Sequence, residues 1–179
     1  MEVYLIRHTE TVIEKGICYG QSDVEIREPF IELFVQIANQ LPDDAILYTS
    51  TLKRCLQLSN YIKHTKNYQN LIQDERLLEM NFGNWELQPW NEINEEELNP
   101  WMKDFVTIKV PRGENFQELH NRVLHFIETE IRKLKNSKPI VIVAHAGIVR
   151  SFLCHYQNLP LKDAFQNKVD FGQVIKIEI

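Results

Sequence analysis

Short runs of apolar residues, each bounded by polar or turn residues, mark the predicted strands of this chain. Three such runs cover residues 3–6, 45–48 and 140–144. Each run is too short for a typical helix and is apolar on both faces, which is typical of strands buried inside a parallel sheet. Residues 175–179 instead alternate apolar and charged side chains. This period predicts a strand with one solvent-facing side, near an edge of the sheet.

Between these runs the apolar positions follow the period of a helix. One apolar stripe covers residues 30–41, a weaker one covers residues 52–62, and the longest covers residues 116–134. Because strands alternate with helices, we expect an α/β fold. Its architecture would be a three-layer sandwich in which helices cover both faces of a mostly parallel sheet.

Residues 83–113 fit this alternation least well. They hold all three tryptophans of the chain, three prolines and an acidic cluster at residues 95–97. We interpret the segment as a small helical cap inserted over one end of the sheet, within a single domain that spans residues 1–179. The alternative is an ordinary solvated helix whose aromatic side chains lie in the core.

The composition narrows the possible partners. A net charge of -5 in 179 residues argues against a general nucleic-acid binder, which usually has a basic face, but leaves room for a local cationic pocket. No apolar run approaches the roughly 20 residues that cross a bilayer. The N-terminus also lacks a basic segment followed by a long apolar run, so neither a membrane span nor a secretory signal is expected.

The three cysteines show no paired spacing, which favours reduced thiols in a cytoplasmic protein. The oligomeric state stays open, a homodimer included.

Two histidines and two arginines follow predicted strands, where a parallel sheet would bring them together. Arg7 and His8 end the first run, and His145 directly follows the third. Arg54 lies in the first turn of the helix after the second run. The carboxyl ends of parallel strands share one edge of the sheet, and ligand clefts form outside that edge. Taken singly, such a histidine is more often a structural residue and such an arginine is usually solvated, so the prediction rests on all four together.

These side chains suit phosphoryl transfer. Guanidinium groups match the oxygens of phosphate, and a neutral imidazole can attack phosphorus to form a phosphohistidine. A carboxylic acid must still protonate the departing alkoxide. Glu79, in an apolar stretch, is the first candidate for this acid; Glu86 is the weaker one, and Glu75 is expected to be a surface residue.

Other phosphate chemistries leave signatures that this sequence lacks. It contains no Gly-x-Gly, no Gly-x-x-x-x-Gly-Lys loop and no cysteine followed six residues later by arginine. No His/Asp cluster has the spacing of a metal site, so neither a metal nor a cofactor is expected. We expect the remaining histidines to be structural or surface residues: His64, His120, His125 and His155.

At five places in order, the chain resembles the histidine phosphatase superfamily in its phosphoglycerate-mutase-like branch. The matching segments are LIRHTET at 5–11, STLKRC at 50–55, LEMNFGNWE at 78–86, PRGENF at 111–116 and VAHAGIVR at 143–150. Thr9 stands where the family has glycine, and Thr51 where it has proline. Any one segment is moderately specific for the family, and all five in order are strong evidence of the resemblance.

The resemblance implies a role for each predicted site residue. His8 would be the phosphorylated nucleophile, and Arg7, Arg54 and His145 would hold the phosphate. Glu79 would be the general acid that later activates water. Substrate contacts are expected from Arg7, Gly20, Arg54, His145 and Ala146. The resemblance implies neither a metal nor an organic cofactor. It implies that the protein binds a small phosphomonoester as its substrate.

The substrate is suggested by two further segments. Residues 16–24 and 158–173 look most like α-ribazole phosphatases, which remove the 5′-phosphate of α-ribazole phosphate, or of its adenosylcobalamin form, in cobalamin biosynthesis. Glu14 stands where many relatives have asparagine beside the phosphate, and an acid there disfavours a second phosphate. Four alternatives stay open: a broad sugar-phosphate phosphatase, a phosphoglycerate mutase, a protein-phosphohistidine phosphatase and a catalytically idle phospho-ligand binder.

Overall fold

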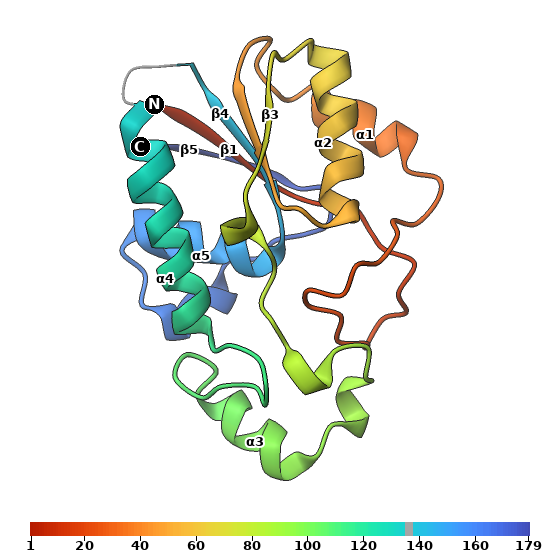
Figure 1. Cartoon of the computed structure of the whole chain (residues 1–179), viewed down its shortest axis with the longest axis vertical. Helices are drawn as coiled ribbons and strands as arrows, with labels where there is room; N and C mark the ends of the chain where they lie inside the picture. Colours follow the sequence, from red (N-terminus) through yellow and green to blue (C-terminus); the bar gives the residue numbers. More distant parts are fainter. Residues whose placement is uncertain (135–137) are drawn as a thin grey trace.

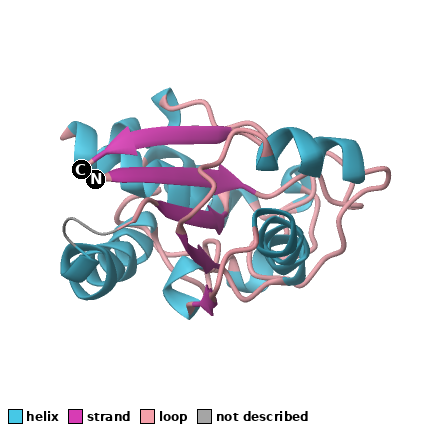
Figure 2. Ribbon diagram, turned by 90° about the horizontal axis from the view of Figure 1, so that it is seen from above, coloured by secondary structure: helices cyan, strands magenta, loops and turns pink. Residues whose placement is uncertain are grey.

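A five-stranded sheet with the strand order β3-β2-β4-β1-β5 forms the centre of the computed structural model, which describes residues 1–134 and 138–179 (Figures 1 and 2). The parallel strands are β1 (Glu2–Arg7), β2 (Ile46–Thr49), β3 (Leu71–Gln73) and β4 (Ile140–Ala144). The last strand, β5 (Val174–Glu178), pairs antiparallel with β1 at the sheet edge. The predicted central strands and the predicted edge strand are therefore confirmed. Because β4 lies between β2 and β1, the carboxyl ends of these three strands are neighbours.

Helices cover both faces of the sheet, which confirms the three-layer prediction. One face packs against α1 (Ile31–Ala38) and α2 (Lys53–Lys66), and the other against α4 (Phe116–Phe126) and α5 (Ala146–Gln157). Alternate side chains of β4 enter the two apolar layers: Ile140 and Ile142 pack toward α4 and α5, whereas Val141 and Val143 pack toward α1 and α2. This alternation follows from the two-residue period of a strand, and it explains why β4 is apolar throughout.

The apolar stripes predict some helices well and others only in part. The longest stripe begins as α4 but continues as a π-helical turn, Ile127–Ile131, and a 3-10 turn, Arg132–Leu134. Neither β3 nor α5 was predicted. The helix α5 is buried around most of its circumference, so its apolar residues form no stripe. Two further 3-10 helices, Glu75–Leu77 and Leu161–Gln166, contact α4 and α5, respectively.

The segment 83–113 lies beyond the carboxyl ends of the parallel strands (Figure 1). It contains two 3-10 turns, Gly83–Trp85 and Trp90–Glu92, and the helix α3 (Glu95–Lys103). The rings of Trp90 and Trp101 stack with their centroids 5.9 Å apart. Trp101 belongs to the same apolar cluster as α4 and α5, so the underside of the segment packs onto that layer. We propose that residues 83–113 form a cap within a single domain.

The cysteines and the helices bear on two further expectations. Cys18, Cys55 and Cys154 are buried and free, as expected for reduced thiols. In the part of the chain that the structure describes, no helix combines the length and the hydrophobicity needed to span a bilayer.

A capping box joins the start of α4 to the segment before it. The Asn115 side chain accepts a hydrogen bond from the backbone N–H of Glu118 at 2.9 Å, and the Glu118 carboxylate accepts one from the backbone N–H of Asn115 at 3.2 Å. The Asn115 amide also donates to the carbonyl oxygen of Thr107 at 2.8 Å. One side chain thus caps the helix and fixes the preceding segment.

The variant Asn115→Ala should lower the free energy of unfolding by about 1–2 kcal/mol, because it removes the helix cap. Urea denaturation of the purified protein measures this change. The control is Asn121→Ala, an exposed position on the same helix, which should change the free energy by less than about 0.5 kcal/mol. Equal stability of Asn115→Ala and the wild type would contradict the role of Asn115 as the cap of α4.

Candidate active site

The carboxyl ends of β1 and β4 place two buried imidazoles side by side. His8 follows β1, and its backbone N–H donates to the carbonyl oxygen of Ala144, the last residue of β4, at 3.0 Å. His145 directly follows β4 and is the N-cap residue of α5. The ring centroids of His8 and His145 lie 5.2 Å apart. Their side chains are exposed by only 2% and 0%, so the predicted convergence of these two histidines is observed.

The protonation state of His8 follows from its contacts. Its Nδ1 lies 2.7 Å from the carbonyl oxygen of Thr9. Since a carbonyl oxygen can only accept, Nδ1 holds the proton and Nε2 keeps its lone pair in the neutral ring. Burial and the positive charges of Arg54 and Arg7 lower the pKa of His8 well below its usual value, against the opposing Thr9 hydrogen bond. His8 is therefore a neutral imidazole at neutral pH.

His145 is contacted by Ser50, which directly follows β2, and by Cys55 of α2. Its Nε2 lies 2.8 Å from Oγ of Ser50 and 3.5 Å from Sγ of Cys55. Burial, followed by the charge of Arg54, lowers the pKa of His145 well below its usual value. We did not predict the contacts of Ser50 and Cys55, because neither residue differs in the sequence from an ordinary strand-end or helix-stripe residue.

Arg54 is fully buried in the first turn of α2. Its guanidinium donates to the carbonyl oxygens of Ser22 at 2.7 Å and Gly20 at 2.5 Å. Among the described residues no carboxylate lies within ion-pair distance of Arg54, so its positive charge is balanced by these carbonyl groups and by the Tyr19 ring, whose centre lies 5.2 Å from the guanidinium carbon. Gly20 is thus brought to the site through its carbonyl group. A Cβ on Gly20 would lie 2.6 Å from Oε1 of Glu86, which explains the glycine at this close approach.

Glu86 holds the loop that contacts Arg54. Its Oε1 accepts from the backbone N–H groups of Gln21 at 2.8 Å and Phe82 at 3.2 Å, and its Oε2 accepts from the Ser22 hydroxyl. Because both oxygens are occupied in fixing the loop, Glu86 is poorly suited to donate a proton to a ligand. This agrees with its rank as the weaker candidate.

Donor groups without a protein partner surround His8. Among the described residues, three buried polar atoms here lack a hydrogen bond: Arg7 Nε, Thr9 Oγ1 and Arg54 Nε. Arg7 itself is fixed by a hydrogen bond to the Val169 carbonyl at 2.8 Å and by the Phe171 ring, 3.5 Å from its guanidinium carbon. Buried donors normally have acceptors, so this group of side chains is suited to an anion. Thr9 does not have a positive φ, which explains why a residue other than glycine is tolerated there.

Glu79 reaches the site through the start of α5. Both its carboxylate oxygens lie 3.2 Å from the backbone nitrogen of Gly147, and Oε1 also accepts from Met80 N–H at 3.0 Å. A helix N-terminus stabilises a nearby negative charge. Gly147 lies two residues after His145 and directly after the buried Ala146, so the predicted acid lies close to the predicted phosphate ligands.

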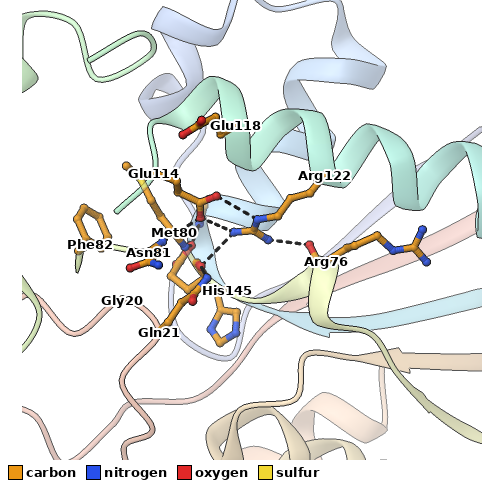
Figure 3. Close-up of polar contacts among 12 residues, drawn as sticks. Gly20, Gln21, Arg76, Met80, Asn81, Phe82, Glu114, Glu118, Arg122 and His145 are labelled. Carbon is orange, nitrogen blue, oxygen red and sulfur yellow. Dashed lines mark hydrogen bonds and ion pairs between the residues drawn. The ribbon is translucent and has the colours of Figure 1, made fainter. Parts of the chain in front are cut away.

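Arg122 of α4 supports the backbone of Glu79, and Figure 3 shows its guanidinium between Glu114 and Arg76. Its guanidinium donates to the carbonyl oxygens of Arg76 at 2.7 Å and Glu79 at 3.0 Å, and it pairs with the Glu114 carboxylate at 2.7 Å. Glu114 in turn accepts from the Asn81 N–H at 2.9 Å. The sequence reasoning missed Arg122, and the only sign of it was an arginine next to the apolar stripe of residues 116–134.

A cavity of about 690 Å³ adjoins the Glu79 carboxylate. Its lining is mostly apolar and aromatic, and comes from α3, α5 and the segments around them. The lining residues are Glu79, Met80, Phe82, Trp90, Leu98, Asn99, Trp101, Met102, Phe105, Phe116, Gly147, Arg150 and Phe165. This volume and chemistry suit the organic part of a small-molecule ligand.

The remaining candidates lie outside this arrangement. Glu75 and Glu14 are exposed. The half-buried His120 contacts Ser151 at 2.8 Å rather than the two site histidines. Among the described residues no cluster of three or more histidine, cysteine and acidic side chains is arranged to hold a metal ion.

The chain is similar to proteins whose names describe different activities on phosphate esters, and three of them follow. The chain is 27% identical to "Putative phosphoserine phosphatase 2" of Hydrogenobacter thermophilus, over 99% of this chain and 89% of the relative. It is 28% identical to "Probable phosphoglycerate mutase GpmB" of Yersinia pestis, over 97% of this chain and 86% of the relative. The solved α-ribazole phosphatase of Shigella flexneri superposes with a TM-score of 0.88 at 25% identity, covering 100% of this chain and 91% of that one.

The family model "Histidine phosphatase superfamily (branch 1)" matches residues 3–179. This match covers nearly the whole chain, including both buried histidines and the segment 83–113. The chain therefore belongs to branch 1 of the histidine phosphatase superfamily.

Proposed function

We propose that this member of a phosphatase and mutase superfamily is a phosphomonoesterase that works through a phosphohistidine at His8. The observation that supports this best is a buried, neutral imidazole whose Nδ1 proton is held by Thr9 and whose neighbours are Arg7, Arg54 and His145. A neutral imidazole is a nucleophile, and buried donors favour the charged oxygens of a phosphoryl group.

In the first step, the lone pair of His8 Nε2 forms a bond to phosphorus, and the bond from phosphorus to the ester oxygen breaks. The Nδ1 proton, donated to the Thr9 carbonyl, stabilises the positive charge that develops on the ring. Glu79 in its acid form gives its proton to the departing alkoxide, which leaves as an alcohol. The two guanidinium groups and His145 supply donors to the phosphoryl oxygens.

In the second step, water attacks the phosphohistidine. The Glu79 carboxylate takes a proton from this water as the new bond to phosphorus forms and the bond to Nε2 breaks. Inorganic phosphate is released, and His8 returns to its neutral form. The step restores the protons of both residues, so no further reactant is needed.

For the substrate, we propose the 5′-phosphate of α-ribazole or of its adenosylcobalamin form. Glu79 borders a large aromatic cavity, and the leaving group must lie next to the acid that protonates it. A planar apolar heterocycle fits such a lining better than the small, charged phosphoglycerates do. The test is a panel of α-ribazole 5′-phosphate, 3-phosphoglycerate and common sugar phosphates, assayed for both phosphate release and isomerisation. Isomerisation of 3-phosphoglycerate without phosphate release would favour the mutase alternative.

Replacing the nucleophile tests the mechanism. The variant His8→Ala should lower phosphate release by about three orders of magnitude or more, because the covalent route is lost. Acid-labile phosphate should be trapped on the quenched wild type and be absent from the variant. The control His120→Ala removes a histidine that contacts Ser151 outside the site and should retain the label. Undiminished turnover in His8→Ala would refute the phosphohistidine and indicate a different catalytic site.

The buried histidines should make the protein less stable in acid. Unfolded histidines have a pKa of about 6.5, whereas burial lowers the pKa of His8 and His145 well below this in the folded state. As the pH falls through about 6.5, the unfolded chain takes up protons that the folded chain does not. Stability is therefore present above that pH and lost below it, by about 1.4 kcal/mol per pH unit for each histidine.

Urea denaturation between pH 7.5 and 5.5 measures this loss. The slope of the unfolding free energy against pH should be smaller for His8→Gln than for the wild type, by the contribution of about one proton. Asn121→Ala should keep the wild-type slope. An unchanged slope in His8→Gln would show that His8 is not held neutral by the fold.

Gly147 provides a test of Glu79 that leaves the carboxyl group in place. A Cβ added at Gly147 would lie 2.4 Å from Oε1 of Glu79, so Gly147→Ala must displace the carboxylate. We expect kcat to fall by about 100-fold or more, as for loss of a general acid, with little change in the affinity for inorganic phosphate. The control Gln157→Ala, exposed at the end of α5, should match the wild type. A wild-type kcat in Gly147→Ala would remove Glu79 from the mechanism.

A further inference from the structure

Three arginines that are at least half-buried have no carboxylate partner among the described residues. Two of them, Arg7 and Arg54, lie beside His8 in the proposed phosphate site. The third is Arg150 of α5. The other half-buried arginines, Arg76 and Arg122, both form ion pairs. Because a buried cation normally has a counterion, Arg150 needs an explanation of its own.

The protein contacts of Arg150 occupy little of its binding capacity. Its Nε donates to the Asn167 carbonyl oxygen at 3.2 Å, and its guanidinium carbon lies 4.6 Å from the centre of the Phe165 ring. Its four remaining N–H groups have no partner among the described residues. Burial lowers the pKa of Arg150, while the charge of Glu79 raises it, and a guanidinium stays protonated in such surroundings.

Arg150 lies in the wall of the cavity that adjoins Glu79. It is three residues after Gly147, which holds the Glu79 carboxylate, so the two positions share one face of α5 about 4.5 Å apart along the axis. Most other lining residues are apolar, including Phe82, Trp90 and Phe105. A ligand whose ester oxygen lies at Glu79 would therefore meet one cation in a mostly apolar wall, about one helical turn away.

We propose that Arg150 is a specificity-determining residue that binds a second anionic group, a carboxylate or a phosphodiester, on a mostly apolar leaving group. This inference rests on the proposed phosphatase function. A guanidinium with several N–H groups unoccupied matches the paired oxygens of either anion. Of the two proposed substrates, only the adenosylcobalamin form has such a group, the phosphodiester that joins its ribose to the corrin. The expected substrate is therefore the larger one.

A matched pair of esters tests the proposal: 4-(2-carboxyethyl)phenyl phosphate and 4-propylphenyl phosphate. The wild type should favour the carboxyl ester by about tenfold in kcat/KM, and Arg150→Met should lose this preference. Arg150→Lys should keep part of it, because the charge remains but the fork is lost. The control Arg132→Met removes the same charge from an exposed arginine paired with Glu128, and should keep the wild-type preference. A preference that is absent in the wild type or unchanged in Arg150→Met would overturn the proposal.

A binding measurement separates this proposal from the phosphatase function. Trp90 and Trp101 line the cavity, so their fluorescence should report occupancy without any turnover. The wild type should bind 3-phenylpropionate about tenfold more tightly than the neutral 3-phenylpropanol, and Arg150→Met should bind the two equally. Equal binding by the wild type would overturn the role of Arg150 even if both esters are hydrolysed. Failure to hydrolyse either ester, with the binding preference intact, would instead refute the phosphatase function alone.

A third comparison identifies the source of the anion. The Arg150→Met change should lower kcat/KM for adenosylcobalamin 5′-phosphate about tenfold more than for α-ribazole 5′-phosphate if the anion is the phosphodiester. Equal effects on these two substrates, together with a lost preference for the carboxyl ester, would identify a carboxylate as the ligand.

Discussion

The buried charge of Arg54 beside two buried imidazoles is the interaction on which the site depends. With no carboxylate near it among the described residues, this guanidinium is balanced by the carbonyl groups of Gly20 and Ser22. Its field, added to burial, keeps His8 and His145 neutral. A carboxylate placed at Arg54 would stabilise the empty protein, but it would also occupy the donors that an anion needs and raise the pKa of both histidines. The loop carbonyls stabilise the cation, but they leave donors free for an anion and do not raise the pKa of the histidines.

Much of this arrangement could be predicted from the sequence because it depends on strand ends. The apolar runs indicate the central strands, and a parallel sheet brings the residues after them to one edge, so Arg7, His8 and His145 could be placed together. Contacts made through the backbone could not be predicted in this way. Glu79 is bound by the N–H of Gly147 and Arg54 by loop carbonyls, and every residue has such groups. The short edge strand β3 and the nearly all-buried α5 lack the periodicity that identifies an element.

The proposed acid, Glu79, is positioned by two elements that belong to different parts of the chain. Arg122 of α4 holds the carbonyl of Glu79, and Gly147 of α5 holds its carboxylate. The contacts of α4 with α5 therefore set the distance between the backbone anchor and the side-chain anchor. Because His145 immediately precedes α5, a shift of that helix would move Glu79 and His145 together. In the proposed mechanism, the position of the proton donor relative to the phosphoryl group therefore depends on the packing of one helix pair.

The same helix joins the proposed reaction centre to the cavity. The N-terminal turn of α5 contacts the Glu79 carboxylate, while Arg150, one turn further, lines the cavity. Relatives with named activities as different as phosphoserine phosphatase and phosphoglycerate mutase are compatible with this division, because the phosphate ligands need not change when the cavity does. The cavity proposed for the organic part of the ligand is lined by α3 and the segments around it, which lie outside the sheet (Figure 1). Substitutions there can alter which alcohol is accepted without disturbing the field at His8, since the charges that set that field come from Arg7 and Arg54 at the sheet edge.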